Sequence, residues 1–148
     1  MSQTKQDTAP SAEQIIYADV LEKGMFAGLM LMITTFALYL LGVMKPAVPL
    51  NEISRYWNLP VHDYLEAINH NFLHLEHPVT GWNWLGLINY GDFVNFVPVA
   101  ILSGITIICY GAVVPGMFKR GDMTYTIIAV LEVLILSLAA SGLLAVGH

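Results

Sequence analysis

Acidic and imidazole side chains recur at helical spacing between residues 61 and 77. Glu66, His70 and His74 are four residues apart, and His77 follows His74 by three, so a helix would place them on one side. Imidazoles combined with a carboxylate form a ligand set suited to Zn²⁺, Cu²⁺ or Fe²⁺. The spacing therefore predicts a possible site for a divalent transition metal.

Two other interpretations of the same polar side remain open. It can be the hydrated face of a helix at the membrane surface, extended one turn earlier by His62 and Asp63. It can also make a pH-sensitive contact through histidine protonation. The spacing is not HExxH and no Glu stands between the histidines, so a zinc protease is not indicated.

A second candidate is Glu132, which interrupts a long apolar run. It lies about nine residues from the preceding turn, or ~13 Å along a helix, near the middle of a bilayer. An ionised carboxylate at that depth costs at least ~2.5 kcal/mol, so Glu132 should face protein and find a hydrogen-bond donor.

Counting the same depth along the other apolar runs predicts the neighbours of Glu132. The count ends near Tyr110 in the second run, beside Cys109, and at Thr34 and Thr35 in the first. Glu132, Tyr110, Thr34 and Thr35 are therefore predicted to form an intramembrane polar cluster. Such a cluster can hold helices together or line a proton or cation pathway.

Three apolar runs must position these residues. They cover residues 24–44, 93–118 and 123–147, and a run of about 25 residues extends roughly 37 Å as a helix. The chain is 56% hydrophobic and only 11% charged, which is typical of a protein embedded in a lipid bilayer. The predicted fold is all-α, an integral membrane three-helix bundle.

The remaining segments complete one membrane domain over residues 11–148, after a disordered tail at residues 1–10. Ser11 and Gln14 form a capping-box pattern, so residues 11–23 are predicted to be a helix. It would lie on the membrane surface or extend the first span. Residues 45–92 form an outer cap that contains an amphipathic interfacial helix over residues 61–77.

The three tryptophans of the chain, Trp57, Trp82 and Trp84, all fall in this cap. They are predicted to form an aromatic belt at the level of the lipid headgroups, with a ligand platform as the alternative.

Small residues at helical spacing suggest close helix contacts. Gly24 and Gly28 form a GxxxG at the start of the first run, a weak signal on its own. The later runs carry similar patterns, and we expect these faces to pack against neighbouring helices. Their members are Ala100 and Gly104, then Ser137, Ser141 and Ala145.

The basic residues near the span ends predict the orientation. Four accompany the tail and the turn between the last two runs, and two lie in the cap: Lys5, Lys23, Lys119 and Arg120, against Lys45 and Arg55. Positively charged segments stay inside, so the N-terminus is predicted to be cytoplasmic and the C-terminus outside, across the cytoplasmic (inner) membrane.

Missing patterns exclude several functions. The sequence has no CxxCH, P-loop, GxGxxG or GxSxG, and no histidine inside an apolar run that would ligate a haem. It has no basic cluster for nucleic acid. We therefore expect a protein that is not an enzyme.

The turn between the last two runs carries a resemblance. Phe118, Arg120, Asp122 and Tyr125 stand in FKRGDMTY, followed by IIAVLEVLILSLAASG. This stretch resembles a family of small bacterial three-span membrane proteins of unknown function, over roughly two-thirds of the chain. The resemblance implies a three-span fold and no particular activity, and the long cap departs from the compact form of that family.

Three hypotheses on function follow. The first is a non-catalytic accessory or assembly subunit of a larger membrane complex, respiratory or transporting, suggested by Glu132 and the small-residue faces. The alternative is a metal-binding membrane protein using Glu66, His70, His74 and His77. The third is a small homo-oligomeric channel or transporter with Glu132 in its interior.

Overall fold

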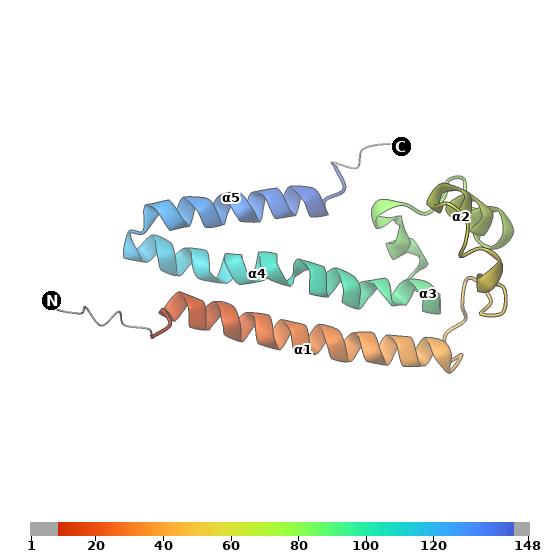
Figure 1. Cartoon of the computed structure of the whole chain (residues 1–148), viewed down its shortest axis with the longest axis horizontal. Helices are drawn as coiled ribbons and strands as arrows, with labels where there is room; N and C mark the ends of the chain where they lie inside the picture. The colour runs from red at the N-terminus through yellow and green to blue at the C-terminus, as the bar shows by residue number, and fades with distance from the viewer. Residues whose placement is uncertain (1–8, 144–148) are drawn as a thin grey trace.

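Three long helices form the body of the molecule in the computed structural model, which describes residues 9–143 (Figure 1). They are α1 (Ala12–Leu40), α4 (Phe96–Arg120) and α5 (Met123–Ala140), and each is long and apolar enough to cross a membrane. The predicted all-α fold with three spans is confirmed. Residues 1–8 of the predicted tail, residues 144–147 of the third run and His148 lie outside the described residues.

Five short elements lie between α1 and α4 and build the outer cap at one end of the three helices (Figure 1). They are η1 (Ile53–Arg55), α2 (Val61–Ile68), η2 (Asn69–Leu73), η3 (Gly81–Leu87) and α3 (Gly91–Val94).

The first helix begins where the capping box predicts. The Ser11 hydroxyl accepts a hydrogen bond from the Gln14 amide, and the Gln14 side chain accepts one from the Ser11 amide at 2.9 Å. α1 then continues without a break to Leu40. Residues 12–23 are therefore an extension of the first span, and the helix ends four residues before the predicted boundary at residue 44.

α4 is the central helix, because α1 and α5 run antiparallel to it on opposite sides (Figure 1). Gly24 and Gly28 of α1 lie where the side chains of Ile105 and Leu102 pack, and a Cβ on Gly28 would stand 2.5 Å from Leu102 Cδ2. The GxxxG thus allows a close approach between the two backbones. By contrast, a Cβ on Gly104 would meet no atom within 4 Å, so that predicted packing face is open.

An ion pair joins the start of α1 to the turn after α4. Arg120 Nη1 lies 2.9 Å from Glu13 Oε2, and the Glu13 side chain is only 11% exposed. Gly121, in the left-handed region at φ +79°, then ends α4 and lets α5 reverse direction. The N-terminus of α1 and the α4–α5 turn therefore lie at the same end of the bundle.

Hydrogen bonds within the cap, and one from the cap to α5, hold the other end of the molecule together. The Asp92 carboxylate accepts from the amides of Ala47 and Val48 at 2.9 and 3.0 Å. Trp82 Nε1 donates to the Ala140 carbonyl at 2.8 Å, at the last residue of α5. The Trp82 hydrogen bond thereby ties the cap, which precedes α4, to the end of α5, which follows it.

The helix predicted over residues 61–77 is shorter than expected. α2 ends at Ile68, and the π-helical turn η2 ends at Leu73. The Asn69 side chain accepts a hydrogen bond from the Leu75 amide and donates one to the Leu75 carbonyl. These two bonds satisfy the backbone groups of Leu75 without a helix, so they compete with helix continuation. His74 adopts a left-handed conformation at φ +53° and stops the helix there.

We expect Gly28→Ala to destabilise the α1–α4 contact by about 1–3 kcal/mol, because the new methyl group would overpack Leu102. Gly104→Ala is the matched control, because its new methyl group would meet no atom. The higher helix propensity of alanine should stabilise this variant by up to about 1 kcal/mol. Thermal unfolding of both purified variants in detergent measures the difference. Equal melting temperatures would contradict the packing described for Gly28.

Candidate functional site

Polar side chains from all three long helices meet at one level, which we call the mid-helix layer: Tyr17 of α1, Tyr110 of α4 and Glu132 of α5. The Tyr17 and Tyr110 rings meet edge to face with their centroids 5.6 Å apart. Glu132 lies close enough to Tyr110 for its carboxylate to interact electrostatically with the Tyr110 side chain. Glu132 is half-buried, as expected of a carboxylate that needs a donor in an apolar helix.

The register of α1 against α4 brings further charges to this level. Tyr17 lies beside Tyr110 and Gly24 beside Ile105, so the α1 residues between them lie at the level of residues 105–110. Those residues are the middle of the 25-residue α4. The segment of α1 that lies there contains Asp19, Glu22 and Lys23, which we call the charged patch.

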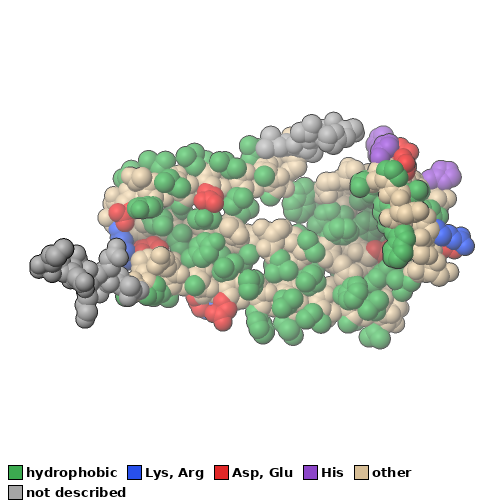
Figure 2. Space-filling view, viewed as in Figure 1, with side chains coloured by type: hydrophobic (Ala, Val, Ile, Leu, Met, Phe, Trp, Pro, Cys, Tyr) green, Lys and Arg blue, Asp and Glu red, His purple; other side chains and the backbone are tan. Residues whose placement is uncertain are grey.

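The charged patch is on the outer surface of the bundle. Lys23 Nζ lies 2.7 Å from Asp19 Oδ2, and both side chains are largely exposed. Glu22 is exposed and forms no ion pair within residues 9–143. Together with Phe26 and Ala27 the patch lines a shallow depression. Figure 2 shows that acidic side chains occur along the mostly hydrophobic body as well as at its ends.

The position of the patch is costly in a lipid bilayer. α4 is ~37 Å long, so a hydrocarbon core of about 30 Å that covers most of it also covers the level of residues 105–110. Ionisable groups at such depth nearly always face protein or a water-filled cavity. One acid, Glu22, has no counter-charge of its own. The arrangement can therefore bind a cationic group presented from outside the chain.

The two threonines predicted to join Glu132 lie elsewhere. Thr34 and Thr35 follow Gly28 towards the cap, and their hydroxyls donate to the carbonyls of Met30 and Met32 in their own helix. Tyr17 takes their place in the mid-helix layer. The depth count began at residue 24, whereas the capping box starts the helix at Ala12, and counting from that box would have found Tyr17 and the charged patch.

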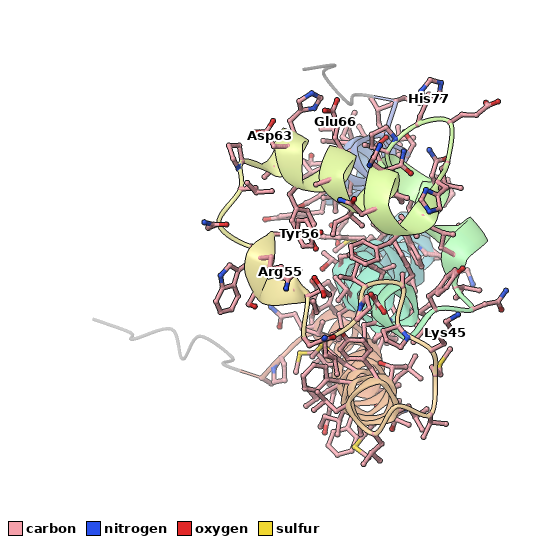
Figure 3. The ribbon with its side chains drawn as sticks, turned by 90° about the vertical axis from the view of Figure 1, so that its right-hand side faces the viewer. Lys45, Arg55, Tyr56, Asp63, Glu66 and His77 are labelled. Atoms are coloured by element: carbon pink, nitrogen blue, oxygen red, sulfur yellow. The ribbon has the colours of Figure 1, made fainter. Side chains whose placement is uncertain are left out.

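The predicted metal ligands occupy the outer rim of the cap. Glu66, His70 and His74 line one shallow depression, while His77 is not part of its lining. Figure 3 shows Asp63, Glu66 and His77 along the rim. Glu66 pairs with His62 at 3.2 Å. Among the residues that the structure describes, no three His, Cys, Asp or Glu side chains are grouped closely enough to hold a metal ion.

The tryptophans divide into two places. Trp82 and Trp84 stack with ring centroids 6.0 Å apart, and Trp84 packs on Phe96 at the start of α4. Trp57 stands apart and is 74% exposed. Trp84 thus belongs to the packing of the cap on the helices.

A double-mutant cycle on Glu132 and Tyr110 tests the mid-helix layer. Glu132→Leu and Tyr110→Phe should each lower stability, and the pair should show a coupling free energy of about 0.6 kcal/mol and at most about 1.7. Glu132→Gln keeps hydrogen-bonding capacity and should remain close to wild type. Additive losses in thermal unfolding would mean that the two side chains do not interact.

Comparison with known proteins gives one finding on identity. No family model matches the chain, and no solved structure matches it. An uncharacterized protein of Archaeoglobus fulgidus is 46% identical over 136 residues, which is 92% of this chain and 91% of the relative. This relative is archaeal, whereas the turn between the last two spans resembled bacterial proteins. The chain belongs to the same family as this archaeal protein, and in this member the fold has three candidate membrane spans.

Proposed function

We propose that the protein is a non-catalytic subunit of a larger membrane assembly, in which the charged patch on α1 docks against a cationic side chain of a partner helix. The observation that carries the proposal is the level of Asp19, Glu22 and Lys23, opposite the middle of α4. Two acids and one lysine leave one negative charge, so the complementary partner carries a Lys or Arg at that depth.

The shape of the bundle supports this function. Within residues 9–143, α4 alone of the three long helices is flanked by helices on two sides, so these residues leave one side of α1 and one side of α5 uncovered (Figure 1). Large apolar side chains are exposed along both helices, which suits lipid or a neighbouring subunit equally. The charged patch favours a neighbouring subunit over lipid, because lipid tails offer Glu22 neither a hydrogen bond nor a counter-charge.

We also propose that the α4–α5 turn faces the cytoplasm and the cap faces outside. Lys119 and Arg120 lie at the same end as the start of α1, while Lys45 and Arg55 lie in the cap. Lys23 belongs to neither end, because it lies opposite the middle of α4. In the sequence, Lys5 precedes the first span, so the remaining basic residues count three on the side of the turn against two on the side of the cap, which favours this orientation.

The assembly is tested by extracting the protein from its own membrane into lipid nanodiscs and measuring its mass by native mass spectrometry. Wild type should be found with other subunits. Glu22→Gln should weaken that association roughly 60-fold, which corresponds to about 2.5 kcal/mol for a charge at mid-membrane depth. Glu22→Lys should abolish it, because it places two cations together.

Glu76→Gln is the matched control, because it removes the same charge from an exposed position in the cap. It should leave the assembly intact. A wild-type chain that leaves the membrane alone, or an assembly that tolerates Glu22→Lys, would contradict the proposal.

Orientation is measured with single cysteines in a Cys109→Ala background, since Cys109 is the chain's own and is fully buried. A membrane-impermeant maleimide added to intact cells should label Glu76→Cys in the cap and leave Lys119→Cys unlabelled. Both should react after permeabilisation. The opposite labelling pattern would reverse the topology.

A further inference from the structure

A cavity of about 420 Å³ lies between the cap and the outer ends of α1 and α4. Its walls are mostly apolar, and five of its lining side chains are aromatic: Tyr39, Tyr64, Trp84, Phe93 and Phe96. Binding cavities for small molecules typically measure about 300–1,000 Å³ and combine apolar walls with a few polar groups. This one is within that range and is separate from the mid-helix layer.

Two hydroxyl groups in the cavity wall lack partners. Tyr39 is only 9% exposed, yet no hydrogen bond joins its hydroxyl, or that of Tyr64, to another of the described residues. Both hydroxyls are therefore free to donate a hydrogen bond to a ligand in the cavity. Asn95, also in the wall, has a buried side-chain oxygen that forms no hydrogen bond with any residue in the range 9–143.

The one carboxylate in the wall already has partners. Asp92 accepts hydrogen bonds from the amides of Ala47 and Val48 through its two oxygens, and it is close enough to Tyr39 to interact with it electrostatically. None of the described residues that line the cavity is a lysine or an arginine. The negative charge of Asp92 disfavours the binding of phosphates and carboxylates, so the cavity favours an uncharged ligand.

We propose that this cavity binds an uncharged, lipid-soluble ring compound with carbonyl acceptors, the chemical class of a substituted quinone. The aromatic walls can stack on a planar ring, and the Tyr39 and Tyr64 hydroxyls can donate to its carbonyl oxygens. A saturated acyl chain would fill the space but leave both hydroxyls unpaired. The position at the end of the spanning helices suits a ligand that is dissolved in the membrane.

The binding test uses 2,3-dimethyl-1,4-naphthoquinone, which has no free position on its quinone ring for addition of a thiol. The full chain in nanodiscs is titrated, and quenching of its tryptophan fluorescence is followed, because Trp84 lies in the cavity wall. We expect saturable quenching. Tyr39→Phe and Tyr64→Phe, which keep the ring and remove only the hydroxyl, should each weaken binding roughly tenfold.

Two controls separate specific binding from partition into lipid. Tyr125→Phe removes a hydroxyl from an exposed position on α5, far along the chain from the cavity wall, and should bind like wild type. Binding of 2,3-dimethylnaphthalene, which has the ring without the carbonyls, should be unaffected by Tyr39→Phe. Quenching that does not saturate would overturn the proposal, and so would equal binding of both compounds to wild type and Tyr39→Phe.

Discussion

The close antiparallel contact of α1 with α4 is the constraint on which the other features depend. Gly24 and Gly28 admit the side chains of Ile105 and Leu102, and this fixes the register of the two helices. The same register pairs Glu13 with Arg120 at one end and brings Tyr39 to the start of α4 at the other. A shift by one helical turn would separate all of these contacts, so the mid-helix layer and the cavity share one cause.

Much of the fold follows from composition and local signals. The apolar runs predict three spans because length and hydrophobicity alone decide membrane crossing, and Ser11 with Gln14 marks the true start of the first helix. The level of Asp19 relative to α4 depends on how the two helices pack. The hydropathy of the sequence alone predicted a first span that begins at residue 24 and leaves Asp19 outside it. The early end of the outer helix depends on Asn69, whose bonds to Leu75 form only when the chain turns back.

The two ends and the middle of the bundle differ in chemistry. The turn end is held by an ion pair, the middle by aromatic rings and a half-buried acid, and the outer end by hydrogen bonds from backbone amides to Asp92. The candidate site could be predicted only in part. Glu132 and Tyr110 follow from depth along the helices, whereas the placement of Tyr17 and of the Tyr39 hydroxyl depends on how separate helices pack.

The bond from Trp82 to Ala140 has a consequence for biosynthesis. The cap is translated before α4 and α5, but one of its fastenings is a carbonyl at the far end of α5. That carbonyl is one of the last groups of its helix and has no partner within the helix. The cap can therefore take its final form only once the third helix has been inserted, so completion of the cap reports that all three long helices have reached the membrane.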